Sequence, residues 1–132
     1  MTARATLLGM GVLLWLSAAA GTAHAATSDG DPVVGKAIYA QCAACHTIAK
    51  GAPNLVGPNL SGVLGKKAAT NRKEFAYSAA LKKSGLVWND ATLDNWIKNP
   101  AAFVPGSKMD FVGLTKKDKR QNVIAYLHQA AR

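Results

Sequence analysis

Apolar positions recur at helical spacing in several segments of the chain, and stretches rich in glycine and proline separate these segments. The first segment follows Pro32, a residue suited to the start of a helix, and covers residues 33–41. Val34, Ile38 and Tyr39 then share one face of the predicted helix. The pattern predicts that this helix runs directly into the next motif of the chain.

Two more helices are predicted in the middle of the chain. A short one covers residues 78–83 and ends at Gly85. Asn89 or Asp90 caps the next one, and Pro100 stops it. The apolar positions of that second helix are Leu93, Trp96 and Ile97.

A last helix is predicted near the C-terminus, where Thr115 and Asp118 resemble a variant capping box. Its apolar positions are Val123, Ile124 and Leu127. The segments 50–65 and 103–114, broken by glycine and proline, are predicted to be loops. No alternating pattern typical of a strand is present, so the sequence predicts an all-α protein.

The first 25 residues have the pattern of an export signal. Arg4 precedes an apolar run over residues 7–16, and the small residues of 23–25 resemble a cleavage site. The run is shorter than the roughly 20 apolar residues that a spanning helix needs, which argues against an uncleaved membrane anchor. We therefore expect a cleaved signal peptide over 1–25, a single domain over 26–132 and a location in the periplasm.

The chain is basic, with 16 lysine and arginine residues against 7 aspartate and glutamate residues and a formal net charge of +9. Such a charge suits nucleic acid, an anionic membrane surface or an acidic protein partner. Export argues against nucleic acid. We expect a monomer without stable membrane insertion that meets other proteins.

Candidate chemistry centres on the sequence Cys-Ala-Ala-Cys-His at residues 42–46. Two thiols at this spacing can each add to a vinyl group of a haem, and His46 can then ligate the iron. A zinc site would need a second ligand pair. A thioredoxin-like dithiol would need a strand–helix–strand context, which the helical pattern does not offer. The motif and the export signal together favour one covalently attached haem c.

A haem iron that His46 ligates has a second axial position, which one more ligand would fill. Met109 is the only methionine after the predicted cleavage site, and it lies in a loop rich in proline and glycine. Simple core filling is the alternative role for Met109, and His128 is the rival ligand. Ligation by His46 and Met109 favours electron transfer, whereas an open sixth site would indicate a haem enzyme or a gas sensor.

Over residues 30–127 the chain resembles the class I, mitochondrial-type cytochromes c and their bacterial soluble electron-carrier relatives. The motifs that carry this resemblance are Gly35, Cys-Ala-Ala-Cys-His at 42–46, Gly-Pro-Asn-Leu at 57–60, Tyr77, Trp88, Pro-Gly-Ser-Lys-Met at 105–109 and Ile-Ala-Tyr-Leu at 124–127. The resemblance implies the class I cytochrome c fold, with helices wrapped around one covalently bound haem. It also implies an electron-transfer protein rather than an enzyme.

The resemblance also implies roles for single residues. Pro58 would accept a hydrogen bond from His46 through its carbonyl oxygen. Tyr77 and Trp88 would donate hydrogen bonds to a haem propionate, with plain core packing as the alternative. Gly35 would let the first helix approach the last one closely.

Three positions depart from the family pattern. Trp96 stands where the family usually has a tyrosine near the methionine sulfur, Leu81 replaces an asparagine, and Lys66 replaces an arginine near the propionates. These changes make one side of the predicted haem site drier and less polar. Trp96 and Lys66 remain candidate haem-site residues.

The partners that the resemblance implies are redox proteins. A terminal oxidase fits as electron acceptor, and a quinol-oxidising complex or a periplasmic dehydrogenase fits as donor. Much of the family's lysine ring around the haem edge is missing here, with Gln41 and Leu55 at two of its positions. We therefore expect a more apolar docking face around Phe111, Val112 and residues 43–44.

Overall fold

The computed structural model describes residues 30–132, and the predicted signal peptide over residues 1–25 lies outside the described residues. The described part is helical. Its five helices are α1 (Pro32–Ala43), α2 (Ala79–Ser84), α3 (Asp90–Lys98), α4 (Pro100–Phe103) and α5 (Lys117–Ala130). Within it, Lys67 and Val87 form one isolated bridge, and no strand is present.

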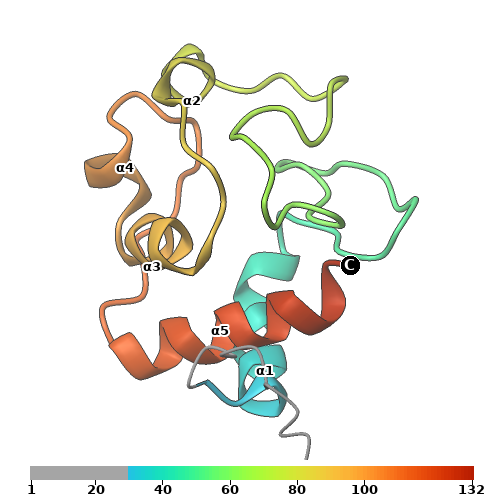
Figure 1. Ribbon diagram of the computed structural model, residues 1–132, viewed down its shortest axis with the longest axis vertical. Coiled ribbons are helices and arrows are strands. Elements are labelled where there is room, and N and C mark those ends of the chain that lie inside the picture. Colours follow the sequence, from blue (N-terminus) through green and yellow to red (C-terminus); the bar gives the residue numbers. More distant parts are fainter. Residues whose placement is uncertain (1–29) are drawn as a thin grey trace, which may run out of the picture.

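Helices α1 and α5 cross each other and form one side of the molecule (Figure 1). Gly35 lies against the backbone of Asn122, and a Cβ atom at Gly35 would come within 2.9 Å of the Cβ of Tyr126. The rings of Tyr39 and Tyr126 pack beside this contact, with their centroids 5.1 Å apart. The prediction that Gly35 permits a close approach of the two helices is confirmed.

The predicted apolar face of α1 is only partly right. Tyr39 is buried and Ile38 packs against the core, but Val34 is exposed. The position that meets α5 is Gly35, which the apolar pattern does not include. The buried face of α1 therefore includes Gly35 in place of Val34, one residue away from the face that the apolar positions predict.

Caps define the middle helices. The Asn89 side chain accepts a hydrogen bond from the Thr92 amide, and the Thr92 hydroxyl accepts one from the Asn89 amide, which makes Asn89 the cap of α3. Helix α3 ends before Pro100, as predicted. The region after Pro100 was predicted without a helix, but Asn99 caps a further turn, α4, that begins at Pro100. Proline is favoured at the first position of a helix, so one residue ends α3 and begins α4.

Helix α5 begins differently from the prediction. Lys116 occupies the cap position without a side-chain cap bond, so the predicted capping box of Thr115 and Asp118 does not form. The Thr115 carbonyl instead accepts a hydrogen bond from the guanidinium of Arg120, one turn into the helix. The predicted apolar positions Val123, Ile124 and Leu127 are buried.

The remaining chain surrounds a central space. Residues 44–78 run as an irregular loop on one side, and α2 to α4 lie on the other (Figure 1). The core joins α1, α3 and α5 to side chains from both sides. Among residues 30–132 no helix is long and apolar enough to cross a membrane.

Candidate functional site

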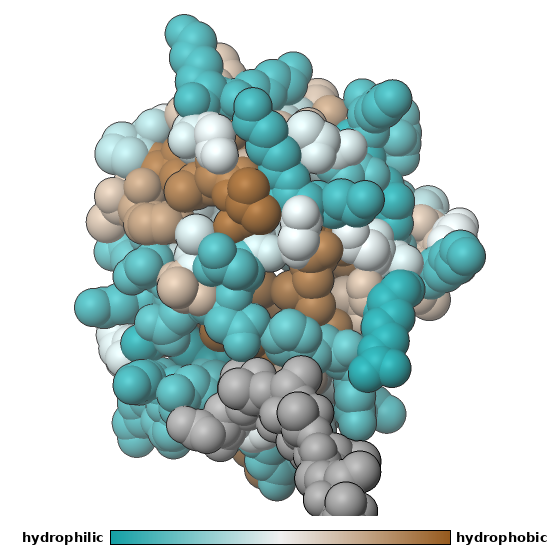
Figure 2. Space-filling view, viewed as in Figure 1, coloured by the Kyte–Doolittle hydropathy of each residue, from teal (hydrophilic) through white to brown (hydrophobic). Residues whose placement is uncertain are grey.

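One cavity of about 690 Å³ lies between the two sides of the molecule. Figure 2 shows hydrophobic surface where the molecule is hollowed, bordered by hydrophilic side chains. Apolar side chains that include Leu81, Trp96 and Leu127 line the cavity, together with a few polar groups. A large apolar cavity with few polar groups is the usual form of a cofactor site.

The end of α1 brings the Cys-Ala-Ala-Cys-His motif to this cavity. The amides of Cys45 and His46 both bond to the carbonyl oxygen of Cys42, at 3.0 and 2.8 Å, which forms a tight turn at the helix end. Cys42, Cys45 and His46 all line the cavity, and both thiols are free. Burial raises the pKa of the Cys42 thiol to about 11, so this thiol is protonated at neutral pH.

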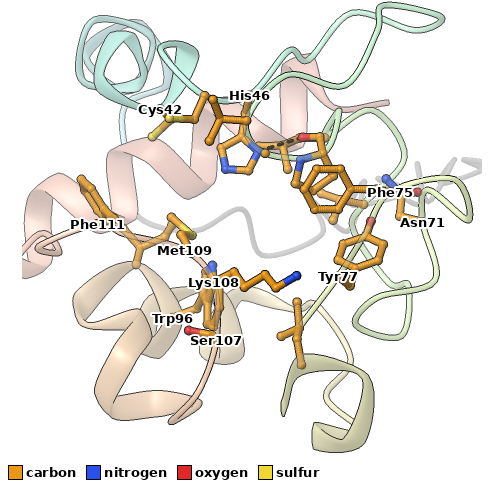
Figure 3. A pocket seen from close by; sticks show the side chains of 18 of the residues that line it. Cys42, His46, Asn71, Phe75, Tyr77, Trp96, Ser107, Lys108, Met109 and Phe111 are labelled. Carbon is orange, nitrogen blue, oxygen red and sulfur yellow. Dashed lines mark hydrogen bonds between the residues drawn. The ribbon is translucent and has the colours of Figure 1, made fainter. Parts of the chain in front are cut away.

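His46 points its imidazole into the cavity (Figure 3). Its Nδ1 lies 2.7 Å from the carbonyl oxygen of Pro58. A carbonyl can only accept, so Nδ1 carries the hydrogen and Nε2 keeps its lone pair for a metal. Burial lowers the pKa of His46, which favours the same neutral form. Gly57 lies flat against the ring, where a Cβ atom would come within 2.6 Å of Nδ1.

Met109 reaches into the cavity from the side opposite His46 (Figure 3). It belongs to a loop that turns at Gly106, whose φ of 85° is in the left-handed region that favours glycine. The rival ligand His128 does not line the cavity. Its side chain is exposed on α5 and lies 2.7 Å from the carboxylate of Asp90.

The predicted hydrogen-bonding residues Tyr77 and Trp88 also line the cavity. The Tyr77 hydroxyl accepts a hydrogen bond from the Arg72 amide at 3.2 Å, which leaves its own hydrogen for another acceptor. Ser107 was not singled out from the sequence. Ser107 also lines the cavity, and its buried hydroxyl oxygen has no hydrogen-bond partner among the described residues. A buried polar group without a partner costs about 1–3 kcal/mol, so these groups suit a cofactor that carries polar substituents.

Lys66 is the predicted site residue that the structure does not bring to the cavity. Its side chain is exposed, and it is absent from the cavity lining. Its backbone carbonyl instead accepts a hydrogen bond from the Trp88 amide at 2.9 Å. Lys66 therefore supports Trp88 through the main chain, while its side chain takes no part in the cavity wall.

Two polar residues at or beside the cavity were not selected from the sequence. Asn59 is 1% exposed, and its side chain donates a hydrogen bond to the Thr47 hydroxyl and accepts one from the Ser61 amide. Arg72 is half-buried, and its guanidinium donates to the side chain of Asn59 and, at 2.8 Å, to the carbonyl of Ser61. Asn59 had a signal in its Gly-Pro-Asn-Leu motif, but Arg72 had none because its partners are remote in sequence.

The alternatives to a haem site find no support in the described residues. Across 30–132, no group of three or more histidine, cysteine, aspartate or glutamate side chains is placed to hold a metal ion. The strand–helix–strand context of a dithiol oxidoreductase is likewise missing from this range. The large apolar cavity, the free thiol pair at its edge and the orphaned Ser107 hydroxyl instead fit a haem.

Helices wrapped around an apolar cavity, with Cys-Ala-Ala-Cys-His at its edge, define a c-type haem protein. The family model described as Cytochrome c matches residues 33–131, and the chain therefore belongs to the cytochrome c family. Members of this family bind one covalent haem c and carry electrons, and they are not enzymes. The predictions of the class I fold, of the haem cofactor and of an electron-transfer protein are confirmed.

Several similar proteins are cytochromes, and the matches with them cover most of both chains. The chain is 49% identical to cytochrome c2 of Rhodoblastus acidophilus over 100 residues, which cover 76% of this chain and 92% of the relative. It is 42% identical to cytochrome c-554 of Methylosinus trichosporium over 108 residues, which cover 82% and 81%. The solved structure of cytochrome cH from Methylobacterium extorquens matches with a TM-score of 0.71 and 45% identity, covering 76% of this chain and 99% of that one.

The departures Trp96 and Leu81 both lie in the cavity wall, and both are buried. We expect the double substitution Trp96→Tyr and Leu81→Asn to shift the midpoint potential of the haem measurably. The new hydroxyl and amide would return polar atoms and water to this wall, and the polarity around a haem is one determinant of its potential. A potentiometric titration of both proteins checks this. An unchanged potential would show that the two departures do not tune the site.

Proposed function

We propose that this protein is an exported one-electron carrier in which Cys42 and Cys45 anchor the haem while His46 and Met109 ligate its iron. One observation carries the proposal: the imidazole of His46 and the thioether of Met109 enter one apolar cavity from opposite sides (Figure 3). The haem supplies the one-electron redox chemistry when it is bound. Two protein ligands leave the iron no open position for oxygen or peroxide, which suits electron transfer.

Two neighbouring residues support the role of His46. The Pro58 carbonyl holds the imidazole in the tautomer whose Nε2 is free to bind a metal. The bare backbone of Gly57 leaves room for the ring to lie close against the loop. The ring is thus oriented before any cofactor arrives, which is the arrangement expected of an axial ligand.

The cysteine pair supports covalent attachment. Both thiols are free and in the cavity wall, and the turn after Cys42 brings Cys45 and His46 round to the same side. Two thioether bonds would consume both thiols and remove them from redox chemistry. The alternative of a thiol oxidoreductase requires instead that both thiols remain titratable.

The mass of the mature protein tests the attachment directly. Covalent haem adds a fixed increment that survives denaturation, and we expect this increment together with no thiol that reacts with an alkylating reagent. The same mass shows whether the chain begins after Ala25, where the export signal would be cleaved. A chain without the increment and with two reactive thiols would overturn the proposal.

We also propose a location in the periplasm and redox proteins as partners. The export signal over residues 1–25 supports the location. A terminal oxidase is the proposed acceptor, and a quinol-oxidising complex or a periplasmic dehydrogenase is the proposed donor. The protein would meet each of them as a monomer, without inserting into the membrane or binding nucleic acid.

The proposed docking face is apolar at the mouth of the cavity. Val56 is 82% exposed and Val112 is 91% exposed, and Val56 and Phe111 both line the cavity. Apolar side chains exposed next to a cofactor opening suit a protein contact where they form one patch. Lys108 and Asp110, which flank Met109, bring opposite charges to the same loop.

We expect the rate of electron exchange with the physiological partner to fall only weakly as ionic strength rises. Salt screens attraction between charges and leaves apolar contact largely unchanged. Stopped-flow rates over a range of salt concentrations measure this dependence. As a matched pair, Val112→Ser should slow the reaction at every salt concentration, whereas Lys119→Ser, on the exposed start of α5, should leave it nearly unchanged. A steep decline of the native rate with salt would contradict the apolar docking face.

A further inference from the structure

Arg72 is a half-buried charged residue beside the cavity that makes four hydrogen bonds. Its guanidinium donates to the Asn59 side chain and to the carbonyl oxygens of Ser61 and Asn71. Its backbone amide donates to the hydroxyl of Tyr77. Three of these four partners, Asn59, Asn71 and Tyr77, line the cavity.

These bonds connect the two stretches of the long loop that carry the site's polar groups. One stretch contains Pro58, which orients His46, and its next residue is Asn59. The side-chain amide of Asn59 donates a hydrogen bond of 2.6 Å to the hydroxyl of Thr47, the residue that follows His46. The other stretch, 71–77, ends at Tyr77. The side chains of Arg72 and its neighbour Asn71 both link them, because the Asn71 amide group donates to the carbonyl oxygens of Asn59 and Ser61 at 3.3 and 3.1 Å.

A second connection closes the same arrangement from the outside. The Asn54 side chain donates a hydrogen bond to the Glu74 carboxylate. Its amide oxygen accepts a hydrogen bond from the backbone N–H of Asn59. Arg72 therefore lies within a closed set of bonds rather than at a free surface. Its charge is half-buried, and salt screens such a charge less than an exposed one.

We propose that Arg72 is a positioning residue of the haem site, which fixes Asn59 and Tyr77 at the cavity wall and places a positive charge behind them. Lys66, the expected cation of this region, is exposed and absent from the cavity lining. Lys108 lines the cavity beside Met109, whereas Arg72 reaches the wall formed by the long loop through its partners Asn59 and Tyr77. A guanidinium can serve three acceptors at fixed angles, which an ammonium on a flexible stem cannot do equally well. The haem gains a positive charge when it is oxidised. A positive charge nearby opposes this gain and therefore raises the midpoint potential of the haem.

The test compares three variants of the holoprotein by potentiometric titration and by denaturant unfolding. Arg72→Gln should lower the midpoint potential and the unfolding midpoint. Arg72→Lys keeps the charge and loses the planar fork, so its potential should stay near the native value while its stability falls. Lys73→Gln removes the same charge from an exposed neighbour, and it should change neither quantity appreciably.

The salt dependence of the potential separates the proposed role from a general effect of net charge. We expect the shift of Arg72→Gln to persist at high salt, where any shift of Lys73→Gln disappears. Equal shifts in the two glutamine variants, or an unchanged potential in Arg72→Gln, would overturn the proposal. The inference uses the family's haem but not the ligand pair, so a native protein with a ligand other than Met109 would refute the proposed function and leave this comparison intact.

Discussion

Replacing Met109 with leucine is expected to abolish the weak far-red absorption band of the oxidised protein, to lower its midpoint potential and to let cyanide bind. Leucine keeps the volume of the side chain, and such exchanges usually cost less than about 1.5 kcal/mol of stability. What the substitution removes is the thioether. Ligation by histidine and methionine raises the potential of a cytochrome c, and axial ligands shift haem potentials over a range of about 0.8 V.

The surroundings of Met109 determine the controls for this experiment. Lys108 lines the cavity beside it, so Lys108→Ala keeps the thioether and should retain the band, while the loss of its positive charge should lower the potential less than the loss of the thioether does. Visible absorption, potentiometry and cyanide titration measure the three effects. Retention of the band in Met109→Leu would contradict ligation by Met109 and would leave it as core filling.

Replacing Arg120 with alanine is expected to lower the free energy of unfolding by about 2–3 kcal/mol, because each buried acceptor left without its donor costs about 1–3 kcal/mol while water solvates part of the carboxylate that remains. Arg120 is 5% exposed and forms a two-armed salt bridge with Asp94 of α3, at 2.8 and 3.1 Å. It also donates to the carbonyl oxygens of Leu114 and Thr115. Alanine would leave a partly buried carboxylate and two carbonyl groups without their donor.

Denaturant unfolding of the holoprotein measures this loss. Lys119 precedes Arg120 and is exposed, and a surface substitution such as Lys119→Ala should stay within about 0.5 kcal/mol of the native value. Because Arg120 also holds the end of the loop that carries Met109, the far-red band of Arg120→Ala should weaken at a lower temperature than that of the native protein. A loss of stability below about 1 kcal/mol would show that the ion pair contributes little.

Arg120 also shows where a sequence-based prediction fails. In the sequence Arg120 is one of 16 lysine and arginine residues and has no other distinguishing feature, and its neighbour Lys119 is exposed. The partner that buries Arg120 lies 26 residues away, and no local pattern joins the two. Arg72 was missed for the same reason. Side chains whose role depends on remote backbone carbonyls leave no periodic signal.

The features that the sequence did predict have local causes. The cap at Asn89, the end of α2 at Gly85 and the buried positions of α5 follow from residues a few places apart. The short spacing within residues 42–46 predicted a site that the turn after α1 brings together. Met109, the proposed opposite ligand, followed from elimination and resemblance rather than from spacing. Its place across the cavity depends on the whole fold.

If His46 and Met109 both ligate the iron of a covalently bound haem, the absorption spectrum of the oxidised native protein shows it. We expect the weak far-red band of methionine bound to ferric iron, and no change of the spectrum when a small ligand such as imidazole is added at low concentration. A spectrum that lacks this band and shifts at once on adding imidazole would refute ligation by Met109 and indicate an open iron site of the kind found in haem enzymes and gas sensors.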